Sequence, residues 1–203
     1  MVIKKAEDLR ALVNQILLAA GASERNAGGV ADHLVAANLA GVDTHGIHHL
    51  GGYVKMINDG VLVPTADPEV VKEGPTSALL RGNWGFGHVT ARDAMEIAIN
   101  KAEEHGVAVA AIVETTHIGR LGYYVEMAAA RQMIGMVWAG GYGVEEPVAV
   151  PYGGRASVLS TNPISIGFPA ASPQNGLCHA SWKRQRIERC RRCNSLRQRF
   201  DIY

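Results

Sequence analysis

GVAVAAIVETTHIGRLGYYVEMAAARQMIGMVWA, residues 106–139, is the stretch of sequence that decides the fold class. It begins with a continuous apolar run, 107–113, as expected of a strand that is buried on both faces in a parallel sheet. A loop (114–120), a helix (about 121–132) and a second apolar run (134–139) follow. This order of strand, loop, helix and strand is typical of a βαβ unit, so the sequence predicts an α/β domain.

The residues before this stretch predict a helical N-terminal segment. Apolar residues recur at helical spacing in two places; Gly21 ends the first helix, and Ser23 can cap the second, which ends at Gly41. A third helix is predicted over 45–59 and ends at Gly60. The residues predicted to be buried by the first two helices are Leu9, Leu12, Val13, Ile16, Leu17, Ala27, Val30, Ala31, Leu34 and Val35.

The middle of the chain predicts a strand followed by a long helix. A turn-rich stretch leads into a short strand over 77–81. Thr90 and Asp93 have the spacing of a capping box and predict the start of a helix that Gly106 ends. A further strand is expected within 157–168.

Composition bounds the class of protein. The chain has 203 residues, 47% of them hydrophobic, which is typical of a globular chain rather than a disordered one. No run approaches the ~18 apolar residues of a membrane span. The N-terminus is typical of an amphipathic helix rather than a secretory signal, so we expect a cytoplasmic protein without membrane contact. Three cysteines are too few for a disulfide scaffold.

The last residues differ from the rest of the chain. Residues 181–203 hold eight Lys and Arg against two Asp and Glu, whereas the preceding residues carry a net charge of −5. A basic tail can attract phosphates, and Cys178, His179, Cys190 and Cys193 are potential zinc ligands. The tail lacks interleaved aromatic residues, and the adjacent Cys178 and His179 chelate poorly, so we expect neither nucleic acid nor zinc as a partner.

Histidines mark the first place where chemistry could occur. In a helix over 45–59, His45, His49 and Tyr53 lie opposite an apolar stripe. This second face is either a solvated surface or the wall of a polar cleft. Two histidines four residues apart also have a metal-ligand spacing, but no third ligand is identifiable, so no metal is expected.

His117 marks the second place. It follows the carboxyl end of the predicted strand 107–113, the edge of an open α/β sheet at which ligands bind. An imidazole with a pKa near ~6.5 can take and return a proton at neutral pH. Arg120 could hold a carboxylate or phosphate. The alternative is a loop histidine beside an unrelated arginine. The sequence has no G-x-G-x-x-G fingerprint in the required context and no Walker A motif, which disfavours Rossmann and P-loop enzymes.

Three segments, in this order and spacing, resemble the malate/L-lactate/ureidoglycolate dehydrogenase family of NAD(P)-dependent oxidoreductases: ADHLVAANLAGVDTHGIHHL (31–50), GVAVAAIVETTHIGRLGYY (106–124) and PYGGRASVLSTNPISIGFP (151–169). The resemblance implies a non-Rossmann α/β domain that binds NAD or NADP. It implies the interconversion of 2-hydroxy acids (malate- or lactate-like) and 2-oxo acids by hydride transfer, in a homodimer. The implied parts are a helical N-terminal segment (1–75), a partial cofactor-binding domain (76–180) and a basic tail outside the family (181–203).

The same resemblance implies roles for individual residues. His117 would be the proton donor and acceptor, and Thr44, His49 and Tyr53 would face the substrate. Many family members have Arg in place of His49, and histidine cannot fork onto a carboxylate as Arg does. The residues that would line the cofactor site are His45, Gly119, Arg120, Leu121, Thr161 and Asn162.

The resemblance stops at about residue 175, although family members continue much further. The change to an Arg- and Cys-rich tail suggests a truncation or a frameshift. Strands would then expose apolar surface, part of the cofactor pocket would be absent, and we expect little or no dehydrogenase activity. Two alternatives remain open: an imine or keto-sugar-acid reductase of the same fold, and a non-catalytic fragment whose basic tail binds nucleic acid or zinc.

Overall fold

The structure is a computed structural model that describes residues 4–140, 150, 152–158, 160–169 and 177–178. The chain divides into two units, residues 1–138 with 164–180, and residues 139–163 with 181–203. The first unit holds all the described helices and strands. In chain order these are α1 (Ala6–Ala19), α2 (Glu24–Leu39), the 3-10 turns η1 (Asp43–His45) and η2 (Ile47–His49), α3 (Leu50–Asn58), β1 (Glu69–Gly74), β2 (Ser77–Arg81), α4 (Gly87–His105), β3 (Val109–Val113), α5 (Gly122–Ala130), β4 (Gly135–Trp138), β5 (Ile164–Gly167) and β6 (Leu177–Cys178).

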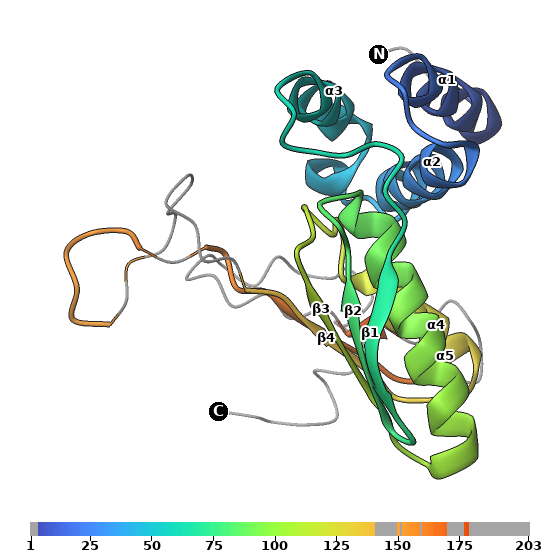
Figure 1. Ribbon diagram of the computed structural model, residues 1–203, viewed down its shortest axis with the longest axis vertical. Helices are drawn as coiled ribbons and strands as arrows, with labels where there is room; N and C mark the ends of the chain where they lie inside the picture. The colour runs from blue at the N-terminus through green and yellow to red at the C-terminus, as the bar shows by residue number, and fades with distance from the viewer. Residues whose placement is uncertain (1–3, 141–149, 151, 159, 170–176, 179–203) are drawn as a thin grey trace, which may run out of the picture. The chain divides into compact units, whose positions relative to one another are not determined.

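A βαβ crossover is the centre of this unit. Strands β1, β2 and β3 form one sheet, in which β1 and β2 are antiparallel and β2 and β3 are parallel. Helix α4 connects β2 to β3 and lies along one face of the sheet (Figure 1). Ala78, Leu80 and Ala94 form the buried core between helix and sheet, and Ile112 packs against it. The predicted α/β class is therefore confirmed.

The predicted strand partners were wrong. The runs 107–113 and 134–139 do form strands, with helix α5 between them, but β3 pairs with β2, whereas β4 pairs with β5. The reason is that α4 supplies the crossover for β3. Helix α5 instead packs on β4 and β5, where Gly135 and Gly167 leave room for Val125.

The strand β3 is covered on only one face, whereas the sequence predicted burial on both faces. Its residues alternate in exposure, and the side chains of Val109 and Val113 are 52% and 41% exposed. Helix α4 covers the other face, on which Ala110 and Ile112 lie. The strand therefore reads as apolar along its whole length although only one of its faces is covered within the described residues.

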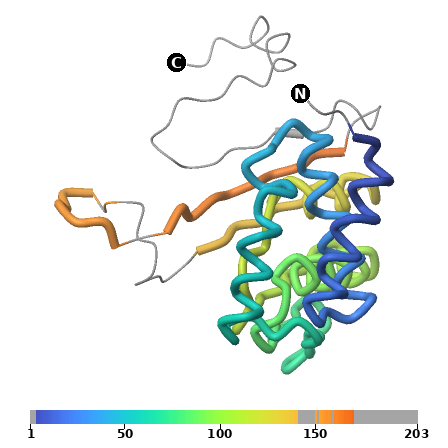
Figure 2. The backbone as a smooth tube through the Cα atoms, turned by 90° about the horizontal axis from the view of Figure 1, so that it is seen from above, coloured from blue at the N-terminus to red at the C-terminus, as the bar shows by residue number. Residues whose placement is uncertain are grey.

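The N-terminal helices form a separate core next to the start of α4. Helices α1 and α2 run side by side (Figure 2). Gly21 takes a positive φ of 93° between them, and the Ser23 hydroxyl accepts a hydrogen bond from the Asn26 N–H, as predicted. The predicted face of α2 is buried, but in α1 only Val13 and Leu17 are fully buried.

Two predicted helix starts were displaced. The helix predicted over 45–59 begins only at Leu50, because the Asn38 side chain accepts the Ile47 N–H and lies where any side chain on Gly46 would be. The helix predicted to start at Thr90 begins at Gly87, whose N–H donates to the Thr116 hydroxyl. A third difference is β1, which lies within the stretch predicted as turns.

The C-terminal predictions lie largely outside the described residues. Residues 179–203 are among those the structure does not describe, so the tail, its zinc alternative and the three-part division of the chain stay predictions. Across the described ranges, no helix has the length and apolar character needed to cross a membrane.

Candidate active site

The loop between β3 and α5 crosses the start of α4 and is fastened to it. The Thr116 hydroxyl donates to the Gly85 carbonyl at 2.8 Å and accepts the Gly87 N–H at 3.1 Å. A Cβ on Gly87 would lie 2.2 Å from the Thr116 carbonyl oxygen and 2.6 Å from that of His117. Glycine is therefore required for the loop to lie this close to the helix.

The loop is held again at its second half. The Ile118 carbonyl accepts the Tyr124 hydroxyl, and the Arg120 N–H donates to Nε2 of His33 at 2.8 Å. Gly119, at φ 72°, packs directly against the His33 ring. Hydrogen bonds of Thr116, Ile118 and Arg120 thus hold the loop in place, and none of these bonds uses the side chain of His117.

His117 projects from this fixed loop. Its Nδ1 lies 2.8 Å from the Tyr53 hydroxyl, and the residue as a whole is exposed to solvent. Desolvation by the surrounding protein, followed by repulsion from the neighbouring His49 and His45, lowers the pKa of His117 from 6.5 to about 4. The ring is therefore neutral at pH 7, so it can accept a proton and remains in contact with solvent.

Two further imidazoles lie beside His117. The ring centroids of His45 and His49 are 5.8 Å and 5.1 Å from that of His117. The His49 Nε2–H donates to the Thr44 carbonyl at 2.8 Å, and the Thr44 hydroxyl lies 3.0 Å from Nδ1 of His45. The three imidazole rings therefore form one cluster. Within the described part of the chain, no three metal-ligating side chains form a metal-binding group.

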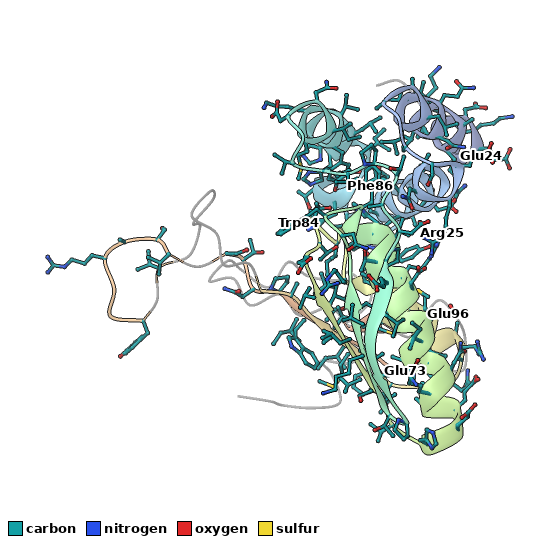
Figure 3. The ribbon with its side chains drawn as sticks, in the orientation of Figure 1. Glu24, Arg25, Glu73, Trp84, Phe86 and Glu96 are labelled. Carbon is teal, nitrogen blue, oxygen red and sulfur yellow. The ribbon has the colours of Figure 1, made fainter. Side chains whose placement is uncertain are left out.

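Tyr53 and His88 form the buried floor of the cluster. The two residues are only 3% and 2% exposed, and the Tyr53 ring packs edge-on against Phe86, which is labelled in Figure 3. The Tyr53 hydroxyl lies 3.3 Å from Nε2 of His88. Burial raises the pKa of Tyr53 and lowers that of His88 well below 6.5, so both are neutral at pH 7.

Sequence reasoning missed His33 and His88. His33 lies at the edge of α2 beyond Val30, outside the predicted core face, and its ring is covered by the loop that carries Gly119 and Arg120. The burial of His88 likewise depends on where the loop at 114–121 crosses α4, so no sequence signal exists for either residue.

The remaining predicted residues have mixed placements. Arg120 is 5% exposed, and its guanidinium pairs with the Glu126 carboxylate at 2.6 Å, so the anion contact suggested for it would compete with Glu126. Leu121 is also buried. Thr161 is exposed and Asn162 is half-buried; both belong to the second unit of the chain.

A shallow hollow at the other end of α4 carries no comparable chemistry. It is lined by Glu73, Pro75, Lys101 and His105, and the Lys101 ammonium already pairs with Glu73 at 2.8 Å. It lies about 25 Å along the helix from His88. The histidine cluster is therefore the better candidate site.

The donor set of the cluster fits proton transfer next to a nicotinamide cofactor. Neutral imidazoles and hydroxyls move protons but do not accept hydride, so oxidation of an alcohol here requires a separate hydride acceptor. Of the residues that the sequence assigns to the cofactor, His45 lies beside His117.

Fold and site together define an α/β protein with a histidine cluster at the carboxyl edge of a parallel strand pair. Residues 4–178 match the malate/L-lactate dehydrogenase family, and the chain belongs to this family.

Named relatives agree with this assignment. The chain is 38% identical to hydroxycarboxylate dehydrogenase B of Escherichia coli strain K12 over 81% of its own length and 45% of that protein. The solved structure of malate dehydrogenase from Pyrococcus horikoshii superimposes with a TM-score of 0.79 at 34% identity, over 84% of this chain and 48% of that one. A delta1-piperideine-2-carboxylate reductase of Pseudomonas syringae gives a TM-score of 0.78 at 27% identity, over 85% and 51%. The chain thus spans about half the length of these relatives.

Proposed function

We propose that this protein is an NAD(P)-dependent oxidoreductase that interconverts 2-hydroxy acids and 2-oxo acids, with His117 as its acid–base catalyst. The observation that carries the proposal is the position of His117: a neutral imidazole of a solvent-exposed residue, on a loop that is fixed on both sides. Family membership supplies the redox half of the reaction.

In the proposed oxidation, His117 accepts the hydroxyl proton of the 2-hydroxy acid at its Nε2. When bound, a nicotinamide would supply the acceptor for the hydride released as the C–H bond of the same carbon breaks and the carbonyl forms. In the reverse direction the protonated His117 returns its proton to the carbonyl oxygen. Protons and electrons balance in both directions without a further reactant.

The other proposed roles follow the resemblance. Thr44, His49 and Tyr53 face the substrate; His49 keeps its Nδ1 available for it, because its Nε2–H is used by the Thr44 carbonyl. NAD and NADP remain equal candidates for the cofactor. The residues proposed to line its site are His45, Gly119, Arg120, Leu121, Thr161 and Asn162. We also propose a homodimer and a cytoplasmic location.

A second candidate is the reduction of a cyclic imino acid, because one structural neighbour is a delta1-piperideine-2-carboxylate reductase. The same imidazole would then protonate the imine nitrogen rather than a carbonyl oxygen. A panel of 2-oxo acids and cyclic imino acids distinguishes the two, since only one class would be reduced with NADH or NADPH.

Binding tests the proposal even if turnover is weak. We expect oxamate, a non-reducible 2-oxo acid analogue, to shift the imidazole NMR resonances of His117 and His49, and NADH fluorescence to change on addition of the chain. Where turnover is measurable, His117→Ala should lower it by about 10²–10⁴. His105→Ala, at the far end of α4, is the matched control. Unchanged His117 resonances with saturating oxamate, or full turnover in His117→Ala, would contradict the proposal.

A further inference from the structure

One buried hydroxyl lies between two imidazole rings. The Tyr53 oxygen is 2.8 Å from Nδ1 of His117 and 3.3 Å from Nε2 of His88. Tyr53 comes from α3, His88 from the first turn of α4, and His117 from the loop after β3. Three separate parts of the fold therefore meet at a single hydrogen-bonding atom.

The hydroxyl carries one proton, so it donates to only one of the two rings. If it donates to His117, then Nδ1 of His117 is bare, and the neutral ring carries its proton on Nε2. If it donates to His88, its oxygen accepts a proton from Nδ1 of His117, and Nε2 of His117 is bare. The hydroxyl orientation and the His117 tautomer are thus linked.

Only the second arrangement is compatible with both protonation states of His117, before and after a proton transfer at Nε2. Protonated His117 has an N–H at both nitrogens, so its Nδ1–H must donate to the Tyr53 oxygen, and the Tyr53 hydroxyl must then donate to His88. A neutral His117 with bare Nε2 uses the same arrangement. A proton can therefore join or leave Nε2 while every other hydrogen bond keeps its direction, which is the advantage of a preorganised site.

His88 is suited to be the final acceptor because it stays neutral. Its ring is buried, and desolvation, followed by the neighbouring His33, His117, His49 and His45, lowers its pKa well below 6.5. Its Nε2 can then accept the Tyr53 hydroxyl. Its Nδ1 carries the proton in this tautomer and has no hydrogen-bond partner among the described side and main chains. An unpaired buried N–H costs free energy, and this tautomer of His88 has to offset that cost.

We propose that Tyr53 and His88 are positioning residues that hold His117 in its Nδ1–H tautomer, with Nε2 as the atom that exchanges the proton. The chain runs from His117 Nδ1–H to the Tyr53 oxygen, and from the Tyr53 hydroxyl to His88 Nε2. It does for His117 what a carboxylate does for the histidine of a Ser-His-Asp triad, but without a charge. The choice of tautomer rests on the proposed function, because it is argued from proton transfer at Nε2.

The tautomer can be read directly by long-range ¹H–¹⁵N NMR of the full chain labelled with [¹⁵N]histidine at pH 7, without cofactor or substrate. His117→Ala identifies the resonances. We expect the Nδ1–H form of His117 to be the majority form in the wild-type chain. Tyr53→Phe should abolish this excess, because phenylalanine leaves Nδ1–H without an acceptor.

Two substitutions at His88 separate positioning from packing. His88→Leu removes the acceptor and should release the Tyr53 hydroxyl to donate to His117, which shifts His117 to the Nε2–H form. His88→Gln restores an acceptor oxygen and should restore the Nδ1–H form. Tyr123→Phe removes a tyrosine hydroxyl from neighbouring α5 and should leave the His117 tautomer unchanged.

The outcomes are distinct from those of the functional test. A wild-type His117 in the Nε2–H form, or one whose tautomer is the same in Tyr53→Phe and His88→Leu, overturns the proposal whether or not the protein turns over substrate. Circular dichroism checks that each variant folds, and the His88 pair decides the question if Tyr53→Phe does not. The expected tautomer pattern together with absent oxamate binding would reject only the proposed function.

Discussion

Gly119 limits what the loop at His117 can tolerate. A Cβ there would lie 2.4 Å from Nε2 of His33 and 2.8 Å from Cδ2 of His88, and the residue has a positive φ of 72°. The sequence assigned Gly119 to the cofactor through its resemblance. Its contacts give it a second task, which is to let the loop reach the two buried rings.

We expect Gly119→Ala to lower the free energy of unfolding by more than about 2 kcal/mol, since the strain of a positive φ adds to the clash with His33. The matched control is Gly41→Ala, which has φ 74° but no atom within 4 Å of the added Cβ, and should cost only about 1 kcal/mol. Urea denaturation measures both. Equal losses would show that the contact with His33 does not matter.

The sequence located His117 because a residue that follows a buried strand can be placed at a sheet edge from the order of elements alone. It could not locate the Tyr53–His88 contact, whose partners are 35 residues apart and come from different helices. Such contacts depend on helix packing, which local periodicity does not encode. The sequence also failed to predict that β3 pairs with β2 and β4 with β5, because these pairings likewise depend on contacts between distant parts of the chain.

At the level of elements, α2 and α4 each bury an uncharged histidine. His33 in α2 is 1% exposed, and burial lowers its pKa from 6.5 to about 3, while the pKa of His88 in α4 is also well below 6.5. Both residues take up a proton near pH 6.5 once the chain unfolds. Below that pH the unfolded chain therefore binds more protons than the folded one.

We therefore expect the free energy of unfolding to be greatest above pH 6.5 and to fall as the pH is lowered from 6.5 towards 3. Each of the two histidines contributes up to about 1.4 kcal/mol per pH unit. His33→Gln, whose amide oxygen can still accept the Arg120 N–H, should reduce this slope, whereas His105→Gln should not. Urea denaturation at pH 7, 6 and 5 measures it; a slope unaffected by His33→Gln would contradict the assignment.

A second element-level feature is the attachment of the turns at 43–49 to α2. The Asn38 side chain accepts the Ile47 N–H at 2.9 Å and donates to the Asp43 carboxylate at 2.5 Å. It also occupies the space beside Gly46, where an added Cβ would lie 2.2 Å from its oxygen. One asparagine thus places both His45 and His49.

We expect Asn38→Ala to cost about 1–2 kcal/mol of unfolding free energy, from the lost hydrogen bonds. Gly46→Ala should cost more in the wild type than in the Asn38→Ala background, because the clash then disappears. The double-mutant cycle, measured by urea denaturation, gives the coupling between the two positions. Additive losses would mean that Asn38 and Gly46 do not compete for space.

For the whole molecule, apolar strand surface is the feature with the largest consequence. Val109 on β3 and Met136 and Trp138 on β4 are 52%, 53% and 63% exposed. The sequence led us to expect such exposure, and the strands show it. Apolar patches of this kind promote association in water.

We expect the chain to self-associate as its concentration rises, and Met136→Lys or Val109→Lys to weaken that association without lowering the free energy of unfolding. Light scattering over a concentration series measures the first, and urea denaturation the second. Lys55→Met, on the surface of α3, adds an isolated apolar residue and serves as the control for general changes in charge. Association that is unchanged by both lysine variants would exclude these strands as the contact surface.

The loop at 114–121 has one more consequence, for protein engineering. Its anchors at Thr116, Ile118 and Arg120 make no use of the imidazole at 117. A designer could therefore install aspartate, lysine or cysteine at that position while the backbone keeps its course, and so screen different reactive groups on one unaltered scaffold.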